Sequence, residues 1–147
     1  MNNDYFSSQA DTYRRFRPSY PEGLFEFLSD ELHSGSLIWD CATGNGQAAM
    51  QFDQRFKIVA TDQSSSQLSH RSFSSNILYA QAKSEHAPFS DRSVSLVTVA
   101  QALHWFNFDA FYREVRRVLR PGGIIAAWTY SFLSASPQLG SDIDECV

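Results

Sequence analysis

The sequence predicts an α/β fold in which helices cover both faces of a mostly parallel, five-stranded sheet. Apolar runs that are typical of buried strands alternate with helical patterns along the middle of the chain. Two of these runs, at 58–60 and 94–100, are largely apolar, as expected for strands that are covered on both faces. A glycine-containing turn follows the first run, at the position where sheets of this kind bind their ligands.

Each expected element has its own pattern. We expect strands at 36–41, 57–61, 77–81, 94–100 and 123–130, helices at 46–54, 65–74 and 108–119, and an irregular stretch near 83–92. An amphipathic helix precedes them, with Pro21 at its first position and a stop at Ser34 and Gly35. The Pro-Gly-Gly sequence at 121–123 should form a sharp turn into the last strand. Because crossovers are right-handed, the winding reverses at the first strand and the expected strand order is 3-2-1-4-5.

Length and composition exclude several classes of protein. The 147 residues suffice for one domain, and a net charge of −4 argues against a general nucleic-acid binder. The chain has no apolar run near the roughly 18 residues of a membrane span, and its first residues are polar. Cys41 and Cys146 cannot build a disulfide scaffold, and no metal-ligand spacing is present. We therefore expect a cytoplasmic protein without membrane, nucleic-acid or metal partners.

The strongest motif is the turn after the first strand, where residues 37–49 read LIWDCATGNGQAA. Gly44 and Gly46 lack side chains, so the backbone can approach a ligand closely. The spacing matches the loose Gly-x-Gly-x-x-Ala form of dinucleotide sites, which is a weak signal, and it also suits S-adenosylmethionine. Asp40 favours the second ligand, because its carboxylate would repel a pyrophosphate and attract a cation. Alternatively, Asp40 fastens the turn by accepting backbone N–H bonds.

Acidic residues follow two later strands. Asp62 ends the second strand about twenty residues after the turn, where a carboxylate can bind ribose hydroxyls. The alternative role for Asp62 is to cap the helix that begins near Ser65. Ser84 and Glu85 follow the third strand, beside the expected position of the cofactor base. The alternative for Glu85 is a solvated loop acid.

Aromatic and basic residues lie at two further positions near the expected site. His104 follows the fourth strand and is a candidate general base; alternatively, it caps a packed aromatic cluster. Trp105 beside it is a candidate pocket wall. Tyr13, Arg17 and Tyr20 precede the sheet and could fold over the cofactor as a lid, although simple packing of an N-terminal helix on the sheet explains them as well.

Seven short sequence blocks stand in order along nearly the whole chain. They are Arg-Pro-x-Tyr-Pro at 17–21, Trp-Asp-x-x-Thr-Gly-Asn-Gly-Gln-Ala at 39–48, Ala-Thr-Asp at 60–62, Ser-Glu at 84–85, Pro-Phe-Ser-Asp-x-Ser-Val at 88–94, Val-Thr-Val-Ala-Gln-Ala-Leu-His-Trp-Phe at 97–106 and Arg-Val-Leu-Arg-Pro-Gly-Gly at 117–123. Together they resemble the class I S-adenosylmethionine-dependent methyltransferases, in particular the small-molecule branch (methyltransferase type 11) that is related to trans-aconitate methyltransferases. The resemblance implies a Rossmann-like, three-layer domain at 1–130, with an N-terminal helical lid at 1–34 and a core at 35–130, followed by an irregular tail at 131–147.

The resemblance also implies that the cofactor is S-adenosylmethionine, with S-adenosylhomocysteine as its product. The residues that would bind this cofactor are Tyr13, Asp40, Thr43, Gly44, Gly46, Asp62, Gln63, Ser84, Glu85, Ala100 and Gln101. The methyl acceptor, a small molecule with a carboxylate, hydroxyl or amine group, would contact Tyr20, His104 and Trp105. Methyl transfer is a direct displacement that depends on alignment more than on acid–base groups, so only a hydroxyl or amine acceptor would use His104 as a catalytic base.

The chain departs from the family pattern at three positions and in length. The family usually has Gly at the position of Ala42, often Asp at that of Ser95, and an acid or small polar residue at that of Lys83. It also continues through two more strands, so that the segment 124–130 would become a sheet edge that invites pairing. We expect the tail, a second copy of the chain or another partner to cover this edge.

Two other functions stay open from the sequence. One is a truncated or degenerate cofactor-binding module without activity of its own. The other is an NAD-dependent oxidoreductase, which Asp40 and Asn45 in the turn disfavour.

Overall fold

The strands form one parallel sheet. The computed structural model describes residues 19–130, so Tyr13, the rest of the predicted lid at 1–18 and the predicted tail at 131–147 lie outside the described residues. The strands are β1 Leu37–Cys41, β2 Lys57–Asp62, β3 Ile77–Gln81, β4 Val94–Ala100 and β5 Leu119–Trp128. All neighbouring strands pair in parallel, in the order β3-β2-β1-β4-β5. This order and pairing confirm the predicted α/β architecture.

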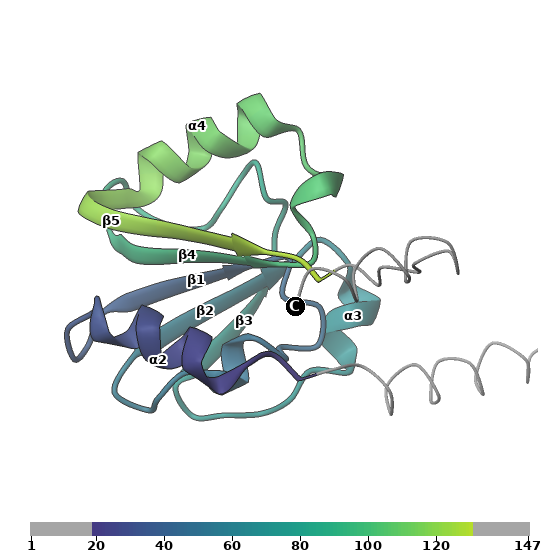
Figure 1. The fold of residues 1–147 in the computed structure, drawn as a ribbon. Coiled ribbons are helices and arrows are strands. Elements are labelled where there is room, and N and C mark those ends of the chain that lie inside the picture. Colours follow the sequence, from purple (N-terminus) through teal and green to yellow (C-terminus); the bar gives the residue numbers. More distant parts are fainter. Residues whose placement is uncertain (1–18, 131–147) are drawn as a thin grey trace, which may run out of the picture.

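Helices lie on both faces of the sheet and give it three layers (Figure 1). They are α2 Glu22–Asp30, α3 Ser65–Ser69 and α4 Phe108–Val118, with short 3-10 turns η1 Ala49–Gln51 and η2 Leu103–Trp105. In Figure 1, α2 crosses one face of the sheet, α4 lies on the side of β4 and β5, and α3 lies near the ends of the strands. Within residues 19–130, no helix is both long enough and apolar enough to cross a lipid bilayer.

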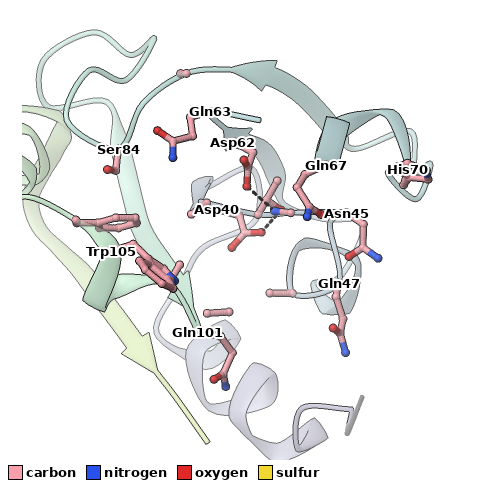
Figure 2. A pocket seen from close by; sticks show the side chains of 18 of the residues that line it. Asp40, Asn45, Gln47, Asp62, Gln63, Gln67, His70, Ser84, Gln101 and Trp105 are labelled. Atoms are coloured by element: carbon pink, nitrogen blue, oxygen red, sulfur yellow. Dashed lines mark hydrogen bonds between the residues drawn. The ribbon is translucent and has the colours of Figure 1, made fainter. Parts of the chain in front are cut away.

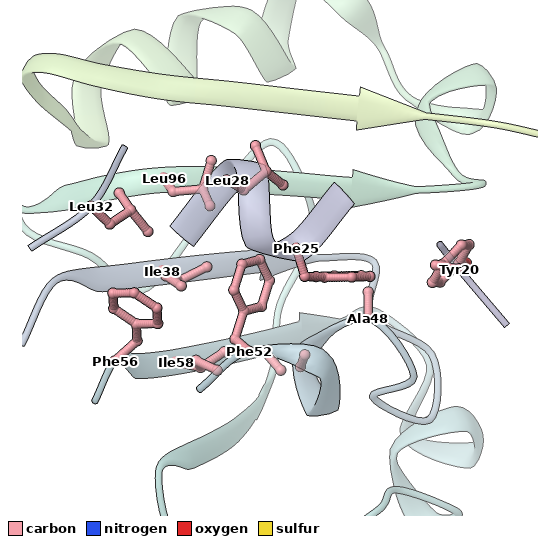
Figure 3. Packing of buried hydrophobic residues seen from close by; sticks show 12 residues of the cluster. Tyr20, Phe25, Leu28, Leu32, Ile38, Ala48, Phe52, Phe56, Ile58 and Leu96 are labelled. Carbon is pink, nitrogen blue, oxygen red and sulfur yellow. The ribbon is translucent and has the colours of Figure 1, made fainter. Parts of the chain in front are cut away.

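An apolar cluster joins α2 to one face of the sheet (Figure 3). Phe25 and Leu28 of α2 are buried against the sheet, and the Phe25 ring meets the Phe52 ring edge-on at 5.1 Å. The helix begins one position later than predicted, because Pro21 is its N-cap. Phe27 of α2 does not join this cluster, since the residue is 65% exposed. Burying a phenylalanine side chain stabilises a fold by about 2–3 kcal/mol, so Phe25 anchors this helix.

A second apolar cluster joins α4 to the opposite face of the sheet. Phe111, Val115 and Val118 are buried and recur at helical spacing, so they form one stripe of α4. Trp39 of β1 is fully buried in this cluster, and its indole N–H donates to the hydroxyl of Thr61 at 2.8 Å. Because β1 is covered on both faces, the sheet positions its carboxyl end without exposing the strand to water.

The predicted helix at 46–54 is wrong, since only the 3-10 turn η1 forms there. The Gly46 N–H donates to the Thr43 carbonyl at 3.0 Å in a tight turn. Gly46 has φ +88°, a left-handed value that an α-helix cannot contain. Downstream, the Asp53 carboxylate accepts the Arg55 N–H at 2.8 Å and turns the chain toward β2.

The predicted helix at 65–74 is correct at its start but too long, since α3 ends at Ser69. Ser64 caps it, because its hydroxyl accepts the N–H of Gln67 at 3.3 Å. The side chains of Ser69 and His70 both bind the Ser66 carbonyl, at 2.7 Å and 2.9 Å. These local bonds compete with the helical backbone bonds and end the helix.

The last strand begins earlier than predicted, at Leu119. The Pro-Gly-Gly at 121–123 does not separate the helix from the strand; it forms an irregularity inside β5. Leu119 pairs with Val94 and Ile124 with Leu96, so five steps along β5 match two along β4. Among the five described strands, β5 is an edge strand, as predicted. What covers this edge stays a prediction.

We expect Gly46→Ala to destabilise the fold by about 2–4 kcal/mol, combining left-handed strain with overpacking. A Cβ at Gly46 would overlap the Tyr79 hydroxyl and lie 2.9 Å from Tyr79 Cζ. Urea unfolding monitored by fluorescence measures the change. Gly23→Ala is the matched control, because Gly23 lies in α2 and a Cβ added there would meet nothing within 4 Å, so alanine should add up to about 1 kcal/mol. Equal stabilities of Gly46→Ala and the wild type would contradict the expectation.

Candidate functional site

A cavity of about 720 Å³ opens at the carboxyl ends of the central strands. β1 lies between β2 and β4, so the winding of the sheet reverses there and leaves space above the strand ends. Figure 2 shows carboxylate and amide side chains from several loops around this space. The predicted residues that line it are Tyr20, Asp40, Thr43, Gly44, Asp62, Gln63, Ser84, Glu85, Ala100, Gln101 and Trp105.

The turn after β1 forms the floor of the cavity. Ala42 has φ +55° and Gly44 φ +60°, so both residues adopt the left-handed conformation. The position where the family resemblance implies Gly is therefore one where alanine is strained. The Thr43 N–H donates to the Thr61 carbonyl at 2.9 Å, which ties the turn to the end of β2. Gly44 has no side chain, so its backbone is open to the cavity. A Cβ added there would meet no atom closer than 3.7 Å.

Asp40 is fully buried near the end of β1. Its Oδ1 accepts the Thr98 hydroxyl at 2.7 Å, and its Oδ2 accepts the Thr43 hydroxyl. Burial raises the pKa of the Asp40 carboxyl from its ordinary value of 3.8 to about 6, although both hydroxyl bonds lower it. The nearby Asp62 carboxylate adds a smaller upward contribution to this pKa. Asp40 is thus an ionised group at neutral pH that a cation would stabilise.

Asp62 fastens the turn, the role that was predicted as an alternative for Asp40. Its Oδ2 accepts the Gly44 N–H at 2.9 Å, and its Oδ1 accepts the Ser64 N–H at 2.8 Å. Asp62 does not cap α3, because Ser64 is the N-cap residue. Each carboxylate oxygen keeps a second lone-pair direction, and the residue lines the cavity. This geometry leaves Asp62 able to accept hydroxyl groups of a ligand.

The loops after β3 and β4 form the remaining walls. Glu85 lines the cavity, and its Oε1 also accepts the N–H of Asn107 at 3.2 Å, so it links this loop to the start of α4. Trp105 lines the cavity while 79% of it is exposed, which places it at the mouth. Tyr20, which precedes α2, also lines the cavity and packs edge-on against Trp128 with 5.6 Å between the ring centroids. Lys83 is exposed and does not line the cavity.

Among residues 19–130, two predicted site residues do not line the cavity. Gly46 is buried under the turn against Tyr79. His104 is exposed and packs against Trp105 with 4.8 Å between the rings. Tyr13 lies outside the described residues. The roles of these residues, and those of the lining residues, stay predictions.

Several lining residues were not predicted from the sequence. They are Ala42, Asn45, Gln47, Ala48, Ser66, Gln67, His70, Ala82, Ala102 and Phe106. Most belong to the turn after β1 or to α3 and its ends. A signal was available, because residues that follow the carboxyl ends of adjoining strands lie at the same edge of a parallel sheet.

The charged side chains that line the cavity within residues 19–130 are acidic. Asp40, Asp62 and Glu85 contribute carboxylates, and the lining within residues 19–130 includes no Lys or Arg. Such a cavity attracts a cationic ligand and repels a pyrophosphate. S-adenosylmethionine, which carries a sulfonium and an ammonium group, suits this field better than a dinucleotide does.

The chain is similar in sequence to proteins that are named as methyltransferases. The family described as "Methyltransferase domain" matches residues 39–127. A protein of Dictyostelium discoideum named as a methyltransferase is 33% identical over 132 residues, which cover 88% of this chain and 50% of that protein. CRG1 of Saccharomyces cerevisiae, named as an S-adenosylmethionine-dependent methyltransferase, is 32% identical over 130 residues, covering 80% of this chain and 44% of that protein.

The similarity extends to a solved structure. A protein from Anaeromyxobacter dehalogenans, described as a type II methyltransferase, superimposes with a TM-score of 0.75 at 34% identity, covering 89% of this chain and 56% of that one. This chain therefore spans about half the length of the curated relatives it matches. With a family match over most of its described residues, the chain belongs to the class I S-adenosylmethionine-dependent methyltransferases.

Proposed function

We propose that this chain binds S-adenosylmethionine and transfers its methyl group to a small-molecule acceptor. The observation that carries the proposal is the pair of buried carboxylates, Asp40 and Asp62, that line one cavity on either side of a turn with a left-handed glycine. A carboxylate, hydroxyl or amine group on the acceptor suits this chemistry. Family membership supports S-adenosylmethionine as the cofactor. The class of the methyl acceptor is part of our proposal.

The residues present fit the proposed cofactor. Asp62 is placed to accept ribose hydroxyls, and the open backbone at Gly44 allows close approach of the nucleoside. Burial raises the pKa of the Asp40 carboxyl to about 6, so a neighbouring positive group would stabilise its ionised form. When bound, S-adenosylmethionine supplies an electrophilic methyl group. Ser84 and Glu85 lie in the loop after β3, where they would flank the adenine.

The contribution of this chain to the reaction would be alignment and exclusion of water. A displacement at a methyl carbon needs the donor and the acceptor held in line, and such positioning can supply most of a rate increase. Trp105 at the mouth and Tyr20, which also lines the cavity, would wall the acceptor side. A carboxylate acceptor needs no base. For a hydroxyl or amine acceptor, His104 stays the proposed base, and its exposed ring would have to rotate toward the cavity to act.

Isothermal titration calorimetry with S-adenosylhomocysteine and with NAD tests the cofactor. Binding of S-adenosylhomocysteine but not of NAD would support the proposal. Binding of NAD but not of S-adenosylhomocysteine would support an oxidoreductase. A methyl-transfer screen over small carboxylic acids, phenols and amines then separates an enzyme from a binding module. The module is the second candidate, because this chain spans about half the length of its relatives.

Asp62→Ala should weaken S-adenosylhomocysteine binding by about 1–3 kcal/mol, the usual loss when a charged hydrogen-bond acceptor is removed. Calorimetry measures the dissociation constant. Asp91→Ala is the matched control, because Asp91 is an exposed acid whose partner is Arg117 and it does not line the cavity. An unchanged dissociation constant in Asp62→Ala would rule out the ribose role.

Asp40→Asn should stabilise the ligand-free fold at neutral pH while weakening cofactor binding. The pKa of Asp40 rises from 3.8 to about 6 on folding, so the folded state holds this proton more tightly than the unfolded state. Stability from Asp40 is therefore fully present below pH 4 and is lost as the pH rises through 6. Asn does not titrate. The free energy of unfolding of Asp40→Asn should therefore exceed that of the wild type by near zero at pH 4 and by at most about 3 kcal/mol at pH 7.5.

Urea unfolding of Asp40→Asn and the wild type at pH 4 and pH 7.5 measures this difference. Parallel titration with S-adenosylmethionine should show weaker binding at pH 7.5, since the cation loses its buried counter-charge. A stability difference that is the same at both pH values would contradict the role assigned to burial.

A partner that covers β5, either a second copy or another chain, is also proposed. The reason is that β5 is an edge strand among the described strands, and unpaired strand edges favour association. Light scattering coupled to size-exclusion chromatography should report a mass above that of one chain. A monodisperse monomer at high concentration would contradict this expectation.

A further inference from the structure

The loop between β3 and β4, residues 82–93, carries two cavity residues at the tip of a tight turn. Ser84 and Glu85 line the cavity. Lys83 and His86 flank them and form a β-bridge, in which the His86 N–H donates to the Lys83 carbonyl at 3.1 Å. Because Ser84 and Glu85 form the tip of the turn, the position of the whole turn decides where they meet a ligand.

The residue after the turn, Ala87, is bonded through both of its backbone polar groups. Its N–H donates to Glu114 Oε1 at 2.8 Å, and its carbonyl accepts Arg117 Nη2 at 3.2 Å. Ala87 is 8% exposed, so its N–H and carbonyl need partners within the protein. Glu114 and Arg117, both on α4, therefore fix the backbone where it leaves the turn.

Arg117 uses all five N–H donors of its guanidinium group. Nε and Nη2 donate to the two carboxylate oxygens of Glu114 at 2.9 Å and 2.6 Å, which makes the pair bidentate. Besides Ala87, the loop offers the Phe89 carbonyl, which accepts Nη1 at 2.7 Å. The remaining bond goes to Asp91, whose side chain is 73% exposed, so this ion pair adds little.

The helix that carries the pair is a firm support for the loop. The apolar stripe of α4 packs against the sheet, so the helix is fixed in place. At its other end, the N-cap residue Asn107 donates its N–H to Glu85 Oε1 at 3.2 Å. The helix thus holds the tip of the turn through Asn107, and the chain after the turn through Glu114 and Arg117.

The Glu114–Arg117 pair acts on the cavity only through this loop. Neither residue lines the cavity. Three of the five bonds that Arg117 donates go to loop residues, and the other two go to Glu114, which itself bonds to the loop. Hydrogen bonding by Arg117 lowers the pKa of the Glu114 carboxyl, so the pair stays charged at neutral pH.

We propose that Glu114 and Arg117 are positioning residues, which act through Ala87 to hold Ser84 and Glu85 where they discriminate the purine base of the cofactor. This inference rests on the proposed function, in which the loop after β3 flanks the adenine. Binding groups must be held to within about 0.5 Å to be selective, and a bidentate pair on a packed helix provides such a hold.

Two ligands that differ only in the base test the proposal without a known methyl acceptor. They are S-adenosylhomocysteine and S-inosylhomocysteine, in which an oxygen replaces the amino group of the base. The wild type should prefer the adenine ligand. Arg117→Lys should weaken S-adenosylhomocysteine about tenfold and reduce this preference about threefold or more, the effect of misplacing one hydrogen bond. Lysine keeps the charge but cannot make the bidentate pair. Calorimetry on the full chain measures both constants.

Two further variants accompany Arg117→Lys. Arg116→Lys is the matched control, because Arg116 is exposed on the same helix and makes no ion pair within residues 19–130, so both affinities should stay unchanged. Glu114→Gln keeps an oxygen for the Ala87 N–H but removes the charge that holds Arg117. It should fold, and it should reduce the preference for adenine in the same direction. Urea unfolding verifies that each variant is folded at the temperature of the titration.

Hydrogen exchange detects the proposed route through the loop. In the ligand-free Arg117→Lys chain, amides of residues 83–89 should exchange faster than in the wild type, because the hold on Ala87 is weakened. Amides of α4 should exchange at the wild-type rate, since the apolar stripe of the helix is unchanged. A lower preference for adenine without faster exchange in the loop would contradict the route.

The binding results separate this inference from the proposed function. Equal weakening of both ligands in Arg117→Lys, with the preference intact, would reveal a purely structural role and overturn the inference. Unchanged binding of both ligands would also overturn it. So would a wild type that binds both ligands equally, since the turn would then not discriminate the base. If the wild type binds neither ligand, the proposed function fails and the inference fails with it.

Discussion

The buried carboxylate of Asp40 is the constraint on which the site depends. A charge inside a sheet covered on both faces is costly unless hydrogen bonds compensate for the lost water. Thr98 on β4 and Thr43 in the turn supply two such bonds, so one carboxylate joins β1, β4 and the turn. The compensation is incomplete, as the raised pKa of Asp40 shows. The fold thus keeps an unneutralised negative charge at the place where a cation can approach from the cavity.

The register of the sheet explains why the polar groups meet. Side chains alternate between faces along a strand, and Asp40 pairs with Ala60 of β2 and with Thr98 of β4. Asp62 lies two residues beyond Ala60, so Asp40, Thr98 and Asp62 all lie on the face that α2 covers. A shift of one residue in either pairing would send one of these side chains to the α4 face. The two apolar clusters, which fix the register, therefore also fix the site.

The strands and their order could be predicted because burial on both faces leaves a continuous apolar signal. β3 and β4 have the predicted bounds, and β1 and β2 differ from them by one residue. The helices were harder to predict where side chains compete with the backbone for hydrogen bonds. The Ser69 hydroxyl and the His70 ring end α3 early, and the left-handed φ of Gly46 excludes this residue from the helix predicted to begin there. Neither effect produces a periodic pattern in the sequence.

The candidate site could be predicted to the extent that it follows strand ends. Asp40, Asp62 and Gln101 lie at or next to the ends of predicted strands, and all three line the cavity. Residues such as Gln67 were missed because their position depends on where α3 begins and on how it packs over the turn. His104 is the opposite case: it follows a strand by a few residues, but the turn η2 directs it away from the cavity lining. The next residue, Trp105, does line the cavity, so the local turn rather than the distance from the strand end decides where these side chains lie.

Two left-handed backbone positions shape the edge of the sheet at which the cavity opens. Ala42 directly follows β1 and Gln101 directly follows β4, and both have left-handed φ values, +55° and +61°. Because β1 and β4 are neighbours, the backbone bends sharply after two adjacent strands at the same edge of the sheet. Neither residue is glycine, so each bend is held against its own preference by bonds to the next strand, from Thr43 to β2 and from Gln101 to β5. The strain therefore lies where the two strands part, and the apolar sheet beneath them supplies the stability that maintains it.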